Sequence, residues 1–147
     1  YATKDKNKRQ HKSVNQFIEL EKENKLDKID TYFKFAKDVK KVKYDSLTNI
    51  KKILSENKKI VGYGAPAKAT TILNYFGLNE NYFKYVVEDS EIKHGKYIPE
   101  TNIQIVSKDD INTEDYEFVL VLAWNFYDSI VKNNKSYFKN SKFIKLK

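Results

Sequence analysis

At residues 60–68 the chain reads Ile60-Val61-Gly62-Tyr63-Gly64-Ala65-Pro66-Ala67-Lys68. The apolar residues before the glycines predict a short buried strand, and the residues from Ala65 to Phe76 predict a helix that stops at Gly77. A glycine-rich turn between a strand and a helix lets the backbone approach an anion, such as a phosphate, at the start of the helix. The pattern Gly-x-Gly-x-x-Ala therefore predicts a nucleotide-binding turn, although a tight turn without a ligand has the same sequence.

Four more apolar runs after this turn predict the rest of a sheet. They lie at residues 82–87, 103–105, 118–123 and 142–146. The run at 118–123 is apolar on both faces, which is typical of a central strand in a parallel sheet, and the last run alternates like an edge strand. Helical patterns at residues 65–76 and 125–131 place the protein in the α/β class. We expect a small Rossmann-like, mainly parallel sheet flanked by helices.

The residues before the sheet form a helical lead-in. Apolar positions from Val14 to Leu20 and from Leu26 to Leu54 recur at helical spacing, with a lapse at residues 21–25. We expect these helices to support the sheet. The predicted organisation is a polar, lysine-rich linker at 1–12 and one Rossmann-like domain at 13–147, with the helical lead-in at 13–57 and the α/β sheet at 58–147.

Composition limits the class of protein. The 147 residues contain no cysteine, which excludes disulfides, thiolate zinc sites and a cysteine nucleophile in this chain. No apolar run reaches the ~20 residues of a membrane span and no signal peptide opens the sequence, so we expect a cytoplasmic protein with no membrane partner. The chain begins at Tyr1 and has no methionine, and we expect it to be a piece of a longer protein.

The net charge of +8 lies at the two ends of the chain. Residues 1–12 carry +4 and the residues after Asp128 carry +6, whereas residues 13–128 carry −2. Among the 28 basic residues only Arg9 is an arginine, the residue that normally recognises guanine and phosphate through paired hydrogen bonds. We therefore expect no nucleic-acid partner.

The first candidate site is the glycine turn itself. Its residues are Gly62, Gly64, Ala65 and Lys68, and the lysine ammonium group would add positive charge to an anion site. Glu88 ends the next predicted strand, near the place where such folds carry an acidic ligand for a ribose. If the backbone of Gly64 approaches a ligand, Gly64→Val should abolish binding and leave most of the fold intact.

The second candidate site is the loop at residues 88–99 with the end of the run at 118–123. The loop contributes His94, Lys96 and Tyr97, although an ordinary surface loop has the same composition. Trp124 follows the apolar run, where it either packs or stacks on a base or a sugar. The sequence holds two histidines, too few for a histidine metal site, and it gives no catalytic residue and no metal ligand.

Three longer stretches resemble one protein family. They are residues 62–75, which read GYGAPAKATTILNY, the loop residues 87–90 and 93–99, which read VEDS and KHGKYIP, and Ala123-Trp124-Asn125. They resemble the C-terminal domain of the S-adenosylmethionine-dependent sugar C-methyltransferases, and the resemblance runs from about Arg9 to the end of the chain. Three positions depart from the family pattern. Glu91 stands where the family usually has proline, Glu100 where it usually has glycine, and Asn102 where it often has histidine.

The resemblance implies a parent enzyme of three parts. These are a zinc-binding N-terminal module, a central methyltransferase domain that binds S-adenosylmethionine, and this C-terminal domain. The parent would remove a proton beside the ketone of a nucleotide-linked keto-sugar, and the enolate would attack the methyl sulfonium. The implied partners are this nucleotide-linked sugar, which the loops at 62–68 and 93–99 would face, and the methyltransferase domain of the same parent chain. The piece alone would not be catalytic.

Two other functions remain open. One is an NAD(P)- or nucleotide-binding Rossmann module of a dehydrogenase or a regulatory protein, supported by the glycine pattern and Glu88. The other is an interaction domain with an empty crevice that docks a partner through its helical lead-in. Binding at the glycine turn would separate the first two functions from the third. A preference for a nucleoside diphosphate sugar over a nicotinamide cofactor would separate the methyltransferase from the dehydrogenase.

Overall fold

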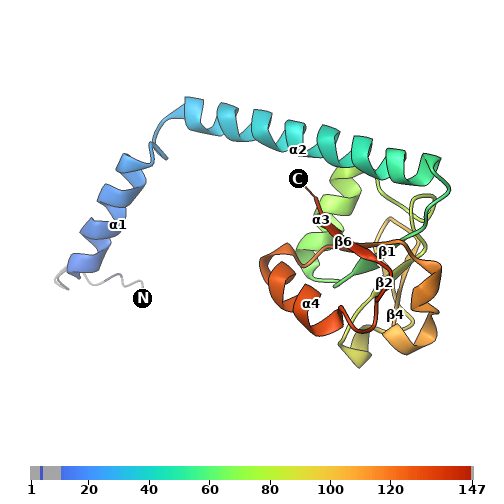
Figure 1. The fold of residues 1–147 in the computed structure, drawn as a ribbon. Helices are drawn as coiled ribbons and strands as arrows, with labels where there is room; N and C mark the ends of the chain where they lie inside the picture. The colour runs from blue at the N-terminus through green and yellow to red at the C-terminus, as the bar shows by residue number, and fades with distance from the viewer. Residues whose placement is uncertain (1–3, 5–10, 147) are drawn as a thin grey trace. The chain divides into compact units, whose positions relative to one another are not determined.

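The computed structural model describes Lys4 and residues 11–146, so the predicted linker at 1–12 lies almost wholly outside the described residues. The chain divides into two compact units, Tyr1–Lys41 and Val42–Lys147. Two helices precede the sheet, α1 over Lys12–Glu23 and α2 over Ile29–Ser55 (Figure 1). These two helices confirm the predicted helical lead-in, and the gap between them confirms the predicted break in its helical pattern. No helix in the described part of the chain combines the length and the apolar character needed to span a membrane.

Within the unit Val42–Lys147, the end of α2 packs against the sheet. Ser46, Ile50 and Ile53 of α2 are buried, whereas α1 buries none of its residues. After α2 the chain reverses at Asn57, which has a positive φ of 56°. Asparagine tolerates this left-handed conformation, which commonly ends a helix.

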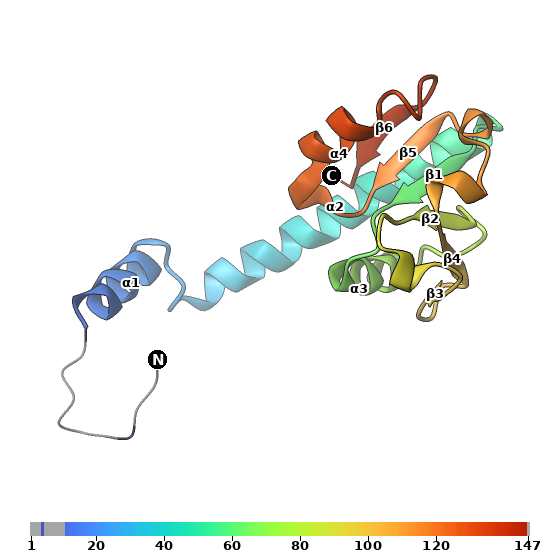
Figure 2. The ribbon, with the colours of Figure 1, turned by 90° about the horizontal axis from the view of Figure 1, so that it is seen from below.

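The sheet has six strands and is parallel except at one edge. The strands are β1 (Ile60–Tyr63), β2 (Tyr85–Val87), β3 (Tyr97–Ile98), β4 (Ile103–Val106), β5 (Phe118–Val121) and β6 (Lys142–Lys145). Their order is β3-β4-β2-β1-β5-β6, and Figure 2 shows them side by side in this order. Only β3 is antiparallel to its neighbour. The α/β class and the mainly parallel sheet are thus confirmed, while β2 is shorter than predicted and β3 was not predicted.

Helices cover both faces of the sheet. On one face, α3 (Ala67–Phe76) and the end of α2 share a core in which Leu73 and Ile50 are 0% and 1% exposed. Gly77 ends α3 with a φ of 74°, as its sequence position predicted. On the other face, the second core holds Tyr63 and Phe138, and α4 (Tyr127–Asn134) packs against it through Ile130. Burial on both faces explains why β5 is apolar throughout, between β1 and β6.

The direction of chain progression reverses beside β1. From β1 the chain passes to β2 and β4 on one side, whereas β5 and β6 lie on the other side. In open parallel sheets such a reversal leaves a crevice beyond the carboxyl ends of the strands, because the connections lead away in opposite directions. The fold therefore places its principal crevice beyond the ends of β1, β2 and β5.

Candidate functional site

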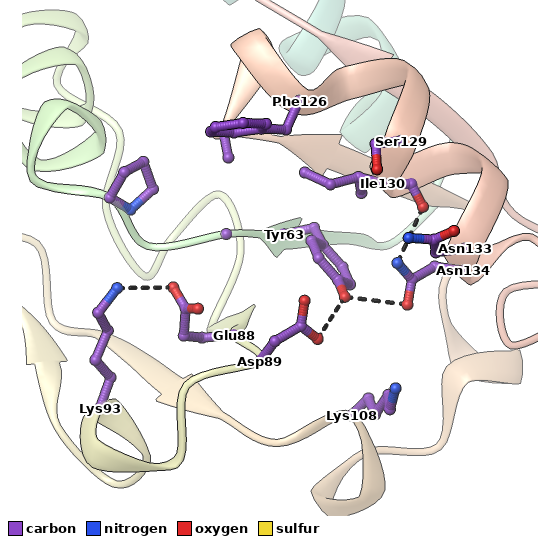
Figure 3. Close-up of a pocket in the computed structure, with 13 residues that line it drawn as sticks. Tyr63, Glu88, Asp89, Lys93, Lys108, Phe126, Ser129, Ile130, Asn133 and Asn134 are labelled. Carbon is purple, nitrogen blue, oxygen red and sulfur yellow. Dashed lines mark hydrogen bonds and ion pairs between the residues drawn. The ribbon is translucent and has the colours of Figure 1, made fainter.

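A cavity of about 580 Å³ lies at this crevice. Its walls come from the ends of β1, β2 and β5, from the loops that follow β1, β2, β4 and β5, and from one side of α4. They are formed by Tyr63, Gly64, Pro66, Glu88, Asp89, Lys93, Lys108, Ala123, Phe126, Ser129, Ile130, Asn133 and Asn134 (Figure 3). Of the predicted site residues, only Gly64 and Glu88 line this cavity.

The two glycines of the turn are required by packing. Gly62 is buried inside β1, and a Cβ atom there would lie 2.6 Å from Cγ2 of Val86. Gly64 has a φ of 83°, and its Cβ would lie 2.8 Å from Cβ of Ala123. Both distances are shorter than real Cβ contacts, so a side chain at either position would force the neighbouring atoms to shift. This close contact with Ala123 gives Gly64 a packing role beside any ligand role, so we expect Gly64→Val to disturb the fold as well as any binding.

Glu88 is bonded to the glycine turn. Its Oε2 accepts the backbone N–H of Ala65 at 2.8 Å and the ammonium group of Lys93 at 3.1 Å, and its Oε1 accepts the N–H of Ser90 at 3.2 Å. Lys93 also donates to the carbonyl oxygen of Ala65 at 3.1 Å. Burial disfavours the charged form of Glu88, but the donors Ala65, Lys93 and Ser90 outweigh it and lower the pKa of the carboxyl group. Glu88 is consequently an ionised carboxylate that joins two loops.

Tyr63 links the end of β2 to α4. Its hydroxyl lies 2.8 Å from Oδ1 of Asp89 and 3.0 Å from Oδ1 of Asn134 (Figure 3). The side-chain amide of Asn134 donates to the carbonyl oxygen of Ile130 at 2.9 Å, which fixes the direction of its Oδ1. Burial and the hydrogen bond to Asp89 raise the pKa of the Tyr63 hydroxyl far above its ordinary value. Tyr63 is thus a neutral hydrogen-bond donor at the wall of the cavity.

Lys68 and Trp124 contact each other. The ammonium nitrogen of Lys68 lies 4.0 Å from the centre of the Trp124 ring, a cation–π distance. Both side chains are half-buried and neither lines the cavity. The structure therefore brings two predicted site residues together as a pair beside the cavity.

The three predicted residues of the loop after β2, His94, Lys96 and Tyr97, do not line the cavity. His94 Nε2 lies 2.7 Å from the carbonyl oxygen of Glu88, so this ring nitrogen donates to the backbone and fastens the loop. Lys96 is exposed, and Tyr97 in β3 is 58% exposed. Strand register places Tyr97 level with Tyr85, the first residue of β2, whereas the cavity lies beyond the opposite end of that strand. The structure does not bring Lys96 or Tyr97 to the cavity walls.

Most polar groups of the cavity were not among the predicted residues. Asp89 directly follows Glu88, so its position at a strand end was a usable signal. Asn134 is 71 residues from its partner Tyr63, and no sequence pattern connects them. Within Lys4 and residues 11–146, no group of three or more histidine, aspartate or glutamate side chains is arranged to hold a metal ion.

Comparison with known proteins assigns the family. Residues 1–146 match the model of the C-methyltransferase C-terminal domain. The chain is also 28% identical over 109 residues to the C-methyltransferase NovU of Streptomyces niveus, an alignment that covers 74% of this chain and 26% of that protein. The chain thus spans about a quarter of the length of this relative. Given the match over nearly all its residues, the chain belongs to the family of C-methyltransferase C-terminal domains.

Proposed function

We propose that the chain is the substrate-side domain of an S-adenosylmethionine-dependent C-methyltransferase that acts on a nucleotide-linked keto-sugar. The observation that carries this proposal is the cavity beyond the ends of β1, β2 and β5, in a chain of this family. Open α/β sheets bind their ligands at this place. The volume of about 580 Å³ is typical of a pocket for a small organic ligand.

The chemistry of the cavity suits a ligand rich in hydroxyl groups with an anionic part. Asp89 is exposed and offers carboxylate oxygens to sugar hydroxyls, and Ser129 and Asn133 on α4 add hydroxyl and amide groups. The ammonium group of Lys108 supplies positive charge for a phosphate. Phe126 is 65% exposed and presents a ring on which a base or a sugar can stack.

The proposed role of this chain is to hold and orient the substrate. Fixing a substrate in a reactive geometry contributes strongly to catalysis without any reacting group on the domain that holds it. S-adenosylmethionine would supply the methyl group from the central domain of the parent, and zinc would belong to its N-terminal module. The glycine turn of this chain gives no support for bound S-adenosylmethionine, because the N–H of Ala65 already donates to Glu88. We expect no methyl transfer by the 147-residue chain alone when donor and substrate are supplied.

Calorimetric titration of the chain tests the proposal. We expect a nucleoside diphosphate sugar to bind and NAD not to bind, and the fluorescence of Trp124, the single tryptophan of the sequence, gives a second signal beside the cavity. Asp89→Asn should weaken binding by about tenfold, the cost of losing one charge-assisted hydrogen bond. Asp128→Asn is the matched control, because Asp128 is also exposed but lies outside the cavity walls.

Three outcomes would contradict the proposal. Tighter binding of NAD than of the nucleotide sugar would favour a dehydrogenase or regulatory module. No binding of either compound would favour an interaction domain. Equal losses of affinity in Asp89→Asn and Asp128→Asn would mean that the ligand does not bind in this cavity.

A further inference from the structure

The glycine turn of this fold holds an anion that belongs to the chain itself. In a strand–turn–helix unit of this kind, the backbone N–H groups at the turn usually receive a phosphate. Here the N–H of Ala65 donates to Oε2 of Glu88 at 2.8 Å, and Glu88 directly follows β2, the neighbouring strand. A carboxylate therefore occupies the hydrogen-bonding position that a ligand phosphate would use.

We propose that Glu88 is a specificity-determining residue, an internal anion that closes the glycine turn to phosphates and thereby excludes dinucleotides and diphosphates from it. The proposal concerns the turn alone, and it holds whether or not the cavity binds a nucleotide-linked sugar. Any phosphate of a ligand then has to be bound by other groups of the cavity, such as Lys108.

Hydrogen bonds to both oxygens hold the carboxylate in place. Lys93 bridges Oε2 of Glu88 and the carbonyl oxygen of Ala65, each at 3.1 Å, and the N–H of Ser90 reaches Oε1 at 3.2 Å. The carbonyl oxygen of Glu88 also accepts a hydrogen bond from His94 at 2.7 Å, so the main chain is held as well. Displacing this side chain would break three interactions at once, those with Ala65, Ser90 and Lys93.

The negative charge of Glu88 also disfavours a phosphate at the glycine turn. The side chain of Glu88 is 13% exposed and that of Lys93 is 40% exposed, so their ion pair is partly shielded from water. The lowered pKa of Glu88 means that the carboxylate is charged at neutral pH. A phosphate approaching Ala65 would meet this negative charge at close range, and Lys93 is already engaged with it.

Removing the carboxylate should create an anion site, and formate is the smallest probe of it. In Glu88→Ala the N–H groups of Ala65 and Ser90 lose their acceptor, and the ammonium group of Lys93 keeps the carbonyl oxygen of Ala65 alone. Sodium formate, compared with sodium chloride at equal ionic strength, should then raise the melting temperature by about 3–6 °C at a concentration tenfold above its Kd. Glu88→Gln should show no such rise, because its side chain still fills the position.

The wild-type chain and Glu91→Ala are the remaining controls, and neither should respond to formate. Glu91 is an exposed carboxylate in the same loop, so its removal changes the charge without opening the turn. A folded Glu88→Ala that gains no specific stabilisation by formate would overturn the proposal. So would a formate response of equal size in the wild-type chain.

A measurement on the wild-type chain decides the matter if Glu88→Ala does not fold. The amide resonances of Ala65 and Ser90 in nuclear magnetic resonance spectra report directly on the turn. We expect inorganic pyrophosphate to leave both resonances unchanged at neutral pH. A saturable shift of the Ala65 amide on adding pyrophosphate would show that the turn is open to phosphates, and the proposal would be wrong.

Discussion

The hydroxyl of Tyr63 lies 2.8 Å from Oδ1 of Asp89, and Oδ1 of Asn134 lies 3.0 Å from the same hydroxyl. A tyrosine hydroxyl carries one hydrogen, so it serves only one of these acceptors at a time. The other acceptor is then available to a donor from water or from a ligand hydroxyl in the cavity. A buried strand residue thus connects opposite walls of the candidate site and prepares it to accept hydrogen bonds.

Tyr63→Phe should lower both stability and ligand affinity. Losing the buried hydroxyl removes the one donor that Asp89 and Asn134 share, at an expected cost of about 1–2 kcal/mol in the free energy of unfolding measured with urea. Affinity for a nucleoside diphosphate sugar should fall severalfold, because Asp89 is no longer held toward the cavity.

The control for this prediction is Tyr137→Phe. Tyr137 donates to Oδ1 of Asp109 at the same distance of 2.8 Å, but its side chain is exposed. Water replaces the lost bond there, so stability should change by less than about 0.5 kcal/mol. Equal losses in the two variants would mean that burial of the Tyr63 hydroxyl carries no particular importance.

Gly64→Ala should destabilise the fold far more than Gly95→Ala. Both glycines have a positive φ, 83° and 76°, so each alanine variant bears the cost of a left-handed conformation, about 1 kcal/mol. At Gly64 the new Cβ would lie 2.8 Å from Cβ of Ala123. At Gly95 no atom of the described residues, apart from its two chain neighbours, lies within 4 Å of the new Cβ. We expect about 1–3 kcal/mol more loss for Gly64→Ala in thermal or urea unfolding. Similar losses in both variants would refute a packing role for Gly64.

Glu100→Gly should stabilise the chain. Glu100 has a φ of 63° and follows Pro99 in a turn that is closed by a hydrogen bond from the N–H of Thr101 to the carbonyl oxygen of Ile98. Glycine adopts this conformation without strain, so the free energy of unfolding should rise by about 0.5–1 kcal/mol. Glu100→Ala removes the same charge but keeps the strain, and it should leave stability nearly unchanged. If Glu100→Gly and Glu100→Ala unfold at the same temperature, the backbone at Glu100 is not strained.

The sequence was sufficient to predict the parallel sheet because its strands are buried on both faces and read as continuous apolar runs. The two-residue strand β3 was missed, since Tyr97 and Ile98 are paired through β4 and not through any local pattern. Among the site residues, glycine spacing located the turn. It did not distinguish a glycine that approaches a ligand from one that packs against Ala123, because that distinction depends on a contact with a strand more than fifty residues away.

The acidic residue at the end of β2 illustrates a second limit. Its place in the sequence is the one expected for a ribose ligand, and the structure does bring Glu88 to the cavity. The direction of its side chain depends on Lys93 and on the N–H of Ala65, which complete its hydrogen bonds within the protein. Sequence position thus predicted where the carboxylate lies, while its partners determine what it binds.

Stability should depend on pH through Glu88 in a defined direction. The pKa of Glu88 in the folded chain lies below its ordinary value of 4.5, so folding favours the charged form. The stabilisation is therefore fully present above about pH 4.5 and is lost as the pH falls through the folded pKa. We expect wild type to exceed Glu88→Gln by about 1 kcal/mol in unfolding free energy at pH 7, and the difference to shrink below pH 4.5.

The comparison with Glu88→Gln isolates this one group. Glu56 and Glu117 also have lowered pKa values. Wild type and Glu88→Gln both contain these two residues, so their contributions cancel when the two unfolding free energies are subtracted. Glutamine has a single acceptor oxygen, so it can still accept the N–H of Ala65 but not also that of Ser90, and the difference measures the charge interaction with Lys93 together with the bond to Ser90. Urea unfolding of both proteins between pH 3 and pH 7 checks the prediction. A difference that stays constant across this range, or grows toward low pH, would mean that Glu88 is not the stabilising carboxylate described by its contacts.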